Sequence, residues 1–249
     1  ISIFYAAFSR YEHREKLIIN DKQLITIVQP NIKQKDKWDG TKRESHLKKL
    51  VQLSTFTSKK YNNKFRIVIW PETGFEGLIP RDLSLLTNTI KAAGLDKKTS
   101  LVTGLLNIKD QNLFNSMASI NSSGNIEYIY NKIHLVPFGE YIPFRLFFKN
   151  MAQFISKADF SSGKNNDMMT LPNLGHVLPL ICYEVLFSGE VRKRISNKTR
   201  LIINITNDAW FGSTIGPYQH FALAKIRAVE LGMPLVRVAN TGISALISP

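Results

Sequence analysis

The chain has 249 residues, of which 44% are hydrophobic and 21% charged, a composition typical of a packed globular protein and not of a disordered one. Its one cysteine, Cys182, excludes an internal disulfide and any zinc site built from several cysteines. The net charge of +14 would suit nucleic acid or an anionic membrane surface as a partner. Because no nucleic-acid-binding motif accompanies the charge, a lysine-rich solvated face is the simpler interpretation.

We expect both ends of the chain to be cut ends of something longer. Ile1–Phe8 is a short apolar stretch without the basic leader and small-residue cleavage site of a signal peptide. Residues 1–21 are therefore interpreted as a lead-in that could be the end of a truncated membrane helix, and residues 22–249 as one domain with a truncated C-terminal end. No apolar run reaches the roughly 18 residues of a complete membrane span.

Short strand-like runs alternate with helical patterns along the chain. The first part predicts strands at 24–28, 65–70, 101–106, 115–120 and 126–130, with helices at 41–59 and 82–93. The second part predicts strands at 177–181, 201–206, 235–239 and 244–247, with helices at 187–195 and 218–231. Several strands are apolar on both faces, which indicates an α/β layered fold with a mixed sheet. The poorly periodic segment 144–169 is expected to be a long loop or lid.

Three strand-like runs each lead directly to one reactive side chain. Glu72 follows the run at 65–70, Lys132 follows the hairpin strand at 126–130, and Cys182 directly follows the run at 177–181. Taken singly, each has a plain alternative: an exposed turn carboxylate, one more lysine and a small buried thiol. Together, a carboxylate, an ammonium and a thiol at strand ends can meet at one edge of a sheet.

Such a meeting would support acyl transfer. The carboxylate takes the thiol proton, the thiolate attacks a carbonyl, and the ammonium with a backbone N–H stabilises the negative charge that develops. A sharp turn between a strand and a helix exposes a nucleophile and is expected to lower the pKa of its thiol. The product of the first step is a thioester on Cys182.

The same segments carry a resemblance to a known family. The sequence WPETGFEG at 70–77, NKIHLVPFGEYIPFR at 131–145 and ICYEVLF at 181–187 resembles the nitrilase (carbon–nitrogen hydrolase) superfamily with its Glu-Lys-Cys triad. NDAWFG at 207–212, GPYQH at 216–220 and VQPNIKQKDKW at 28–38 make the chain most similar to the apolipoprotein N-acyltransferase branch of bacterial envelopes.

The resemblance implies a single-domain, nitrilase-like αββα sandwich with mixed sheets and a role for each matching residue. Glu72 would be the general base, Lys132 the oxyanion stabiliser and Cys182 the nucleophile that carries the acyl group. The resemblance also implies three supporting residues: Glu140 would position Lys132, and Tyr183 and Glu184 would lie beside the nucleophile. Trp38 would be a substrate-binding residue.

The resemblance also implies a reaction and its partners. A phospholipid would give its acyl chain to the cysteine, and a diacylglyceryl lipoprotein would accept it on its N-terminal amine, without a metal or a diffusible cofactor. The setting would be the bacterial inner membrane with the domain facing the periplasm, and nucleic acid would not be a partner. The family's membrane helices are absent from this chain.

Two alternatives remain open at this stage. A soluble amidase or nitrilase could use the same triad to hydrolyse a small amide or nitrile, with water in place of the amine. A catalytically silent domain could instead bind nucleic acid through its basic surface. The three histidines that could suggest a metal site, His134, His176 and His220, lack ligand spacing and are better interpreted as structural hydrogen-bonding residues.

Overall fold

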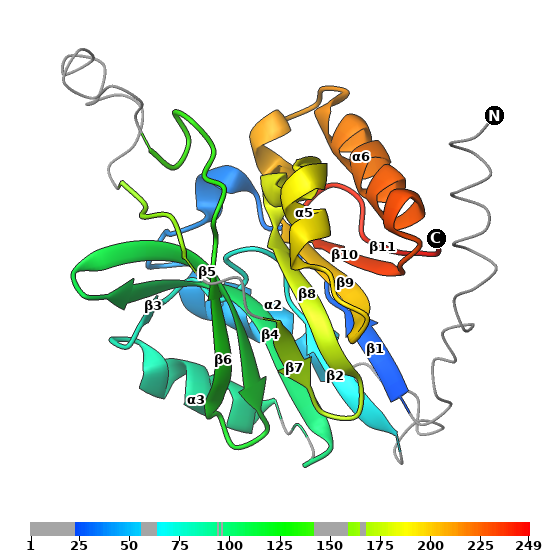
Figure 1. Ribbon diagram of the computed structural model, residues 1–249. Coiled ribbons are helices and arrows are strands. Elements are labelled where there is room, and N and C mark those ends of the chain that lie inside the picture. Colours follow the sequence, from blue (N-terminus) through cyan, green and yellow to red (C-terminus); the bar gives the residue numbers. More distant parts are fainter. Residues whose placement is uncertain (1–22, 56–63, 94, 96, 142–158, 165–167) are drawn as a thin grey trace, which may run out of the picture.

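A computed structural model describes residues 23–55, 64–93, 95, 97–141, 159–164 and 168–249 (Figure 1). The expected lead-in at 1–21 and most of the expected lid, residues 144–158, lie outside these described residues.

The first half of the chain builds a mixed, six-stranded sheet in the order β1-β2-β4-β5-β6, with β3 paired to β4. β1, β2 and β4 run parallel, whereas β4, β5 and β6 are antiparallel neighbours. Their bounds are β1 Gln23–Ile27, β2 Phe65–Ile69, β3 Leu78–Ile79, β4 Thr99–Lys109, β5 Asn112–Asn121 and β6 Ile126–Asn131.

The second half builds a five-stranded sheet in the order β11-β10-β9-β8-β7. β8, β9 and β10 are parallel, and the two edge strands run antiparallel to their neighbours. The bounds are β7 Met169–Leu171, β8 Gly175–Ile181, β9 Thr199–Thr206, β10 Leu235–Ala239 and β11 Ala245–Ile247.

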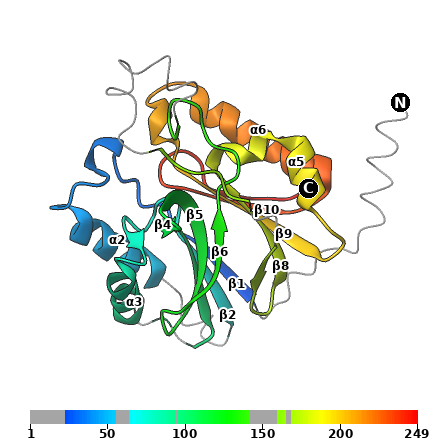
Figure 2. The same ribbon diagram turned by 60° about the vertical axis from the view of Figure 1, so that its left-hand side comes forward.

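The two sheets pack face to face and helices cover both outer faces, which gives four layers (Figures 1 and 2). α2 (Arg43–Thr55) and α3 (Leu83–Ala92) cover the first sheet, and α5 (Ser188–Arg194) and α6 (Gly216–Leu231) cover the second. Buried side chains of both sheets form the middle of the sandwich, among them Ile69, Val102, Met117, Val177, Ile203 and Val238. The expected αββα sandwich with two mixed sheets is thus confirmed.

The described residues also include the short 3-10 helices η1 (Gln34–Asp36), η3 (Cys182–Leu186), which follows β8, and η4 (Asp208–Phe211), which follows β9. The structure differs from the sequence prediction chiefly in the hairpin of β4 and β5. The expected strands at 101–106 and 115–120 are longer and meet at a tight turn, where Asp110 and Gln111 have φ of 51° and 64°. Neither residue is a glycine, so the turn carried no strong sequence signal.

Candidate active site

Glu72 lies three residues beyond the end of β2, in a loop pressed against β4. Trp70 donates its backbone N–H to Val102 O at 2.8 Å, which continues the sheet pairing past the strand end. A Cβ on Gly104 would lie 2.7 Å from the Cα of Glu72, so only glycine lets the loop approach β4 this closely. The carboxylate is buried, with the residue 7% exposed.

Glu72 and Glu140 share one amide donor. Asn115 on β5 donates its side-chain N–H groups to Glu72 Oε1 and to Glu140 Oε1, both at 2.8 Å. The second oxygen of Glu72 accepts the backbone N–H of Asn207 at 2.9 Å, and that of Glu140 accepts the backbone N–H of Val136 at 2.8 Å. Both carboxylates are therefore fixed in direction by donors from several elements.

Lys132 lies directly after β6 and faces both carboxylates. Its Nζ is 2.7 Å from Glu140 Oε2 and 3.7 Å from Glu72 Oε1, and the residue is only 1% exposed. Burial lowers the pKa of Lys132, but the negative charges of Glu72, Cys182 and Glu140 outweigh burial and raise it overall. Lys132 is therefore a permanent cation at this position.

The thiol of Cys182 lies within electrostatic reach of Glu72 and Lys132. Burial raises its pKa to about 12, the charge of Glu72 adds to the rise, and Lys132 and the Thr206 hydroxyl oppose it. The expectation of a lowered thiol pKa is therefore wrong for the resting site, because burial and a carboxylate outweigh one ammonium. The thiol is neutral at neutral pH and needs a base to become a nucleophile.

The backbone at Cys182 turns sharply between β8 and η3. Its φ is 51°, in the left-handed region that residues other than glycine seldom adopt. The turn ends the strand at the nucleophile, as the sequence suggested, but the helix that follows is a short 3-10 turn.

Glu184 fixes the peptide chain on both sides of the nucleophile. Its Oε2 accepts the backbone N–H of Ile181 at 2.7 Å, and its Oε1 accepts the Tyr130 hydroxyl at 2.7 Å. The same Oε1 accepts the backbone N–H groups of Ile133 and His134 at 2.8 and 3.2 Å. This one buried carboxylate therefore ties the strand end of Cys182 to the chain that follows Lys132.

Tyr183 and Trp38 lie further out. Tyr183 is half-buried and its ring packs edge-on against Phe187, with centroids 5.0 Å apart. Trp38 is 48% exposed, has a φ of 69°, and donates its backbone N–H to Glu76 Oε2 at 3.0 Å. An exposed indole held by a rigid backbone beside the Glu72 loop is available for contact with a ligand.

Lys37 is a second buried lysine beside the site, and sequence reasoning did not single it out. Its Nζ donates to Thr73 O at 2.9 Å and to Thr73 Oγ1 at 2.8 Å, and it lies 3.4 Å from Glu72 O. Burial lowers its pKa to about 8, while Glu76 and Glu72 act in the opposite direction. Lys37 thus fastens the loop of Trp38 to the loop of Glu72.

Asn115 and Asn207 were also missed. Asn207 lies within the NDAWFG motif, so its motif was noticed while its contact with Glu72 was not. Asn115 is one asparagine inside a strand, and no spacing in the sequence sets it apart. In the part of the chain that the structure describes, no group of three His, Cys, Asp or Glu side chains could hold a metal ion.

The fold and this cluster of residues define the class of protein. Residues 24–249 match the model of the carbon–nitrogen hydrolase family, and the chain belongs to that family. Solved structures support the fold. The structure is similar to that of Nit3 of Saccharomyces cerevisiae, a member of the nitrilase superfamily. The superposition covers 90% of this chain and 82% of Nit3, with a TM-score of 0.64 and 16% sequence identity. For an amidase from Nesterenkonia sp. AN1 the TM-score is 0.55 at 17% identity, over 91% of this chain and 84% of the amidase.

Among curated relatives, the similarity points to one branch. The chain is 39% identical over 237 residues to the apolipoprotein N-acyltransferase of Allorhizobium ampelinum, over 91% of this chain and 44% of that protein. It is 36% identical over 258 residues to the apolipoprotein N-acyltransferase of Rhizobium leguminosarum, and the alignment covers 98% of this chain and 47% of that protein. The chain therefore spans less than half the length of the curated relatives that it matches.

Proposed function

We propose that this chain is the catalytic domain of an N-acyltransferase that moves a fatty acyl chain from a phospholipid to the N-terminal amine of a diacylglyceryl-cysteine lipoprotein. One observation carries the proposal: the only thiol of the sequence belongs to a half-buried cysteine within electrostatic reach of a buried carboxylate and its paired ammonium. The name of the relatives described above, apolipoprotein N-acyltransferase, supports an apolipoprotein amine as the acceptor. The phospholipid donor is taken from the family resemblance of the sequence.

In the first half of the proposed reaction, Glu72 accepts the proton of the Cys182 thiol. The thiolate attacks the ester carbonyl of the phospholipid, and the bond from sulfur to the acyl carbon forms. The ester bond to glycerol then breaks, and Glu72 gives its proton to the glycerol oxygen, which releases a lysophospholipid and regenerates the base. Lys132 stabilises the oxyanion, together with a backbone N–H after Cys182. A general base is needed because the raised pKa of the thiol, about 12, leaves almost no thiolate at neutral pH.

In the second half, the lipoprotein amine attacks the thioester. The new amide bond forms, the bond from carbon to sulfur breaks, and the proton lost by the amine returns to the cysteine sulfur through the carboxylates. Glu140 forms an ion pair with Lys132. Asn115 donates hydrogen bonds to the carboxylates of both Glu72 and Glu140, so the proton-accepting oxygen stays in place during both steps. Trp38 and Tyr183 are assigned to contacts with the substrate and with the chain beside the nucleophile.

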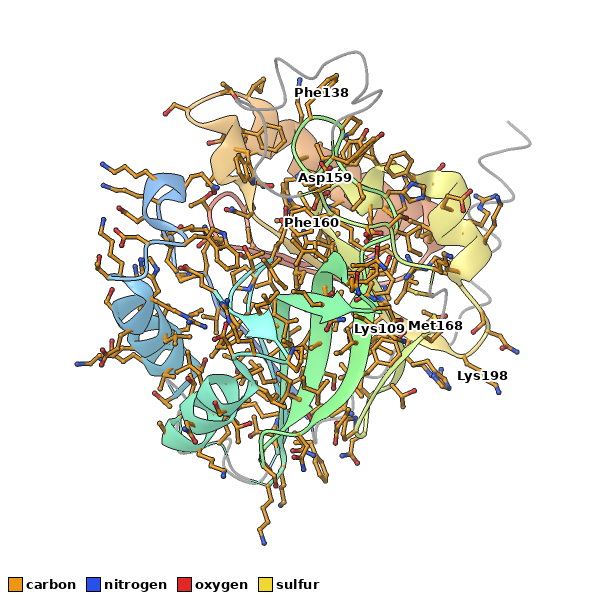
Figure 3. All side chains as sticks on the ribbon, turned by 90° about the vertical axis from the view of Figure 1, so that its left-hand side faces the viewer. Lys109, Phe138, Asp159, Phe160, Met168 and Lys198 are labelled. Carbon is orange, nitrogen blue, oxygen red and sulfur yellow. The ribbon has the colours of Figure 1, made fainter. Side chains whose placement is uncertain are left out.

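A setting at the bacterial inner membrane, with this domain on the periplasmic side, belongs to the same proposal. Several large apolar side chains are exposed around η4 and the start of α6, namely Trp210, Phe211, Ile215 and Tyr218. Phe138 is also exposed, and Figure 3 shows it at one end of the molecule, beyond Asp159 and Phe160. Such side chains suit contact with lipid. No helix among the described residues is long and apolar enough to cross a membrane.

The test separates an amine acceptor from water. The chain is incubated with vesicles of phosphatidylethanolamine labelled in the sn-1 acyl chain, with and without a diacylglyceryl-cysteine peptide. The proposal expects label on the peptide amine and none when Cys182→Ser replaces the wild type. Hydrolysis of small amides without transfer to the peptide would favour the amidase alternative instead. Label transfer that survives in Cys182→Ser would overturn the mechanism.

A further inference from the structure

The carbonyl of Cys182 is held by side chains that take no part in the proposed chemistry. His220 on α6 places its Nε2 3.3 Å from Cys182 O, and Asn204 on β9 donates its side-chain N–H to the same oxygen at 3.3 Å. A carbonyl only accepts hydrogen bonds, so the Nε2 of His220 carries a proton in this arrangement. Two donors thus converge on the carbonyl oxygen of the peptide group that joins Cys182 to Tyr183.

A buried charge pair holds His220 in turn. The Nδ1 of His220 is 2.9 Å from Asp208 Oδ1 and 3.0 Å from the guanidinium nitrogen of Arg237, which is 2.8 Å from Asp208 Oδ2. Arg237 also donates to the side-chain oxygen of Asn204. All four residues are at most 5% exposed. The ring of His220 and the amide of Asn204 are therefore fixed from behind.

The chain around this cluster makes further close contacts with Asp208. Thr206 at the end of β9 donates its hydroxyl to Asp208 Oδ1 at 3.0 Å. A Cβ on Gly242 would lie 2.9 Å from the Cβ of Asp208, so that loop fits closely only with glycine. The four residues come from four elements. β9 and β10 are neighbours in the second sheet, α6 covers that sheet (Figure 1), and η4 contacts α6.

The left-handed backbone of Cys182 explains why such support is needed. A residue other than glycine with a φ of 51° is strained, and it keeps that conformation only where the surroundings enforce it. Relaxation of this peptide would turn the thiol and the following N–H away from the positions that attack and charge stabilisation require.

We propose that Asn204, Asp208, His220 and Arg237 form a positioning network that holds the peptide of Cys182 in its reactive conformation. The proposal rests on Cys182 being the nucleophile of the proposed function. None of the four touches the reacting atoms. They act through the carbonyl of Cys182. His220 contacts this carbonyl directly, and its substitution leaves the ion pair of Asp208 and Arg237 in place.

The test uses an acyl donor that does not depend on phospholipid binding. With p-nitrophenyl butyrate, the cysteine sulfur bonds to the butyryl carbon, the ester bond breaks and p-nitrophenolate leaves, so that the burst of phenolate reports thioester formation. The variants are His220→Phe, which keeps a ring but no donor, and His220→Gln, whose side-chain N–H can reach Cys182 O. His176→Phe, at the far end of β8 where His176 contacts Thr170, is the control.

We expect His220→Phe to lower the burst rate at saturating ester about tenfold with little change in KM, because a hydrogen bond that holds the reactive geometry is lost. His220→Gln should stay within about threefold of the wild type, and His176→Phe should match it. Urea unfolding of all three variants identifies any loss of fold.

An equal loss in the Phe and Gln variants would overturn the proposal, because it would mean that His220 serves packing alone. Wild-type burst rates in His220→Phe would overturn it as well. If the burst depends on His220 as expected while phospholipid gives no acylation, the positioning network stands and the proposed acyl donor falls. If Cys182→Ser still shows the burst, the nucleophile itself is misassigned and both proposals fail.

Discussion

Cys182 is kept protonated by its surroundings at rest, and its activation depends on Glu72. The thiol has a pKa raised to about 12 by burial and by the adjacent carboxylate, against the opposing effect of Lys132. The resting site therefore holds a neutral thiol among charged groups, and the thiol becomes a reactive thiolate when a base takes its proton. This differs from cysteines that rest as thiolates beside a cation.

The raised pKa predicts how the free thiol reacts with iodoacetamide. Below the pKa the thiolate fraction grows about tenfold for each pH unit, so the alkylation rate should still be rising steeply between pH 8 and pH 10. The rate is measured by intact mass, and the single cysteine makes the assignment unambiguous. A rate with its midpoint near pH 8.5, levelling off by about pH 9.5 as for a free cysteine, would contradict a raised thiol pKa.

Lys132 is also expected to hold the site together energetically. Lys132→Met leaves the buried carboxylates Glu72 and Glu140 without their cation, and breaking a buried pair on one side costs about 3–5 kcal/mol. Urea unfolding should show a loss of this order. Lys193→Met, which removes an exposed ion pair with Glu190 on α5, is the matched control and should leave stability nearly unchanged. Equal stabilities for the two variants would argue against a buried ion pair at Lys132.

Among the elements, most strands and helices followed from the sequence because their patterns are strong. β10 at Leu235–Ala239 is predicted to the residue, and α6 and its end at Gly232 follow from a helical pattern closed by a glycine that adopts a left-handed φ of 55°. The short strands β3 and β7 were missed because two or three residues carry no periodicity.

The candidate site was predictable only in part, for a related reason. Glu72, Lys132 and Cys182 stand at strand ends, where topology rather than sequence neighbours brings side chains together. The sequence neighbours of Asn115 and Lys37 do not set either residue apart. Only the fold reveals that Asn115 contacts the Glu72 carboxylate and that Lys37 contacts the loop of Glu72. Their contribution is visible from distances and not from residue types.

The link between β6 and β8 through Glu184 gives a prediction at the scale of elements. Glu184→Gln keeps the shape but turns one acceptor into a donor facing the N–H or O–H groups that the carboxylate now accepts. Leaving buried donors unsatisfied costs about 1–3 kcal/mol each, so the free energy of unfolding should fall by about 2–4 kcal/mol in urea. Glu127→Gln, on the exposed side of β6, serves as the control. A Glu184→Gln variant as stable as this control would contradict the link.

At the scale of the whole molecule, the site exists only where the two sheets meet. Asn115 lies on β5 of the first sheet, and Glu72 and Lys132 follow its strands β2 and β6. Cys182 and Asn207 follow strands β8 and β9 of the second sheet. The middle of the sandwich is apolar and buried, so it fixes the spacing of the two sets of side chains.

A cavity in this middle layer should therefore affect both fold and activity. Ile203→Ala, at a position with 0% exposure on β9, is expected to cost about 2–5 kcal/mol. In a urea titration followed by circular dichroism and by the p-nitrophenyl butyrate burst, both signals should shift together to lower urea. Leu246→Ala, at a residue that is 59% exposed on β11, should shift neither. Separate transitions for fold and burst would mean that the site survives without the packed sandwich.

The most direct test of the account is the mass of the chain after exposure to phosphatidylethanolamine vesicles of one defined sn-1 acyl chain. We expect a gain of one such acyl group, located on the peptide that contains Cys182 and removed by hydroxylamine as a thioester is. The gain should be absent in Cys182→Ser and strongly reduced in Glu72→Gln. An acyl group found on another residue, or an unchanged gain in Cys182→Ser, would contradict the central claim that this sulfur carries the chain.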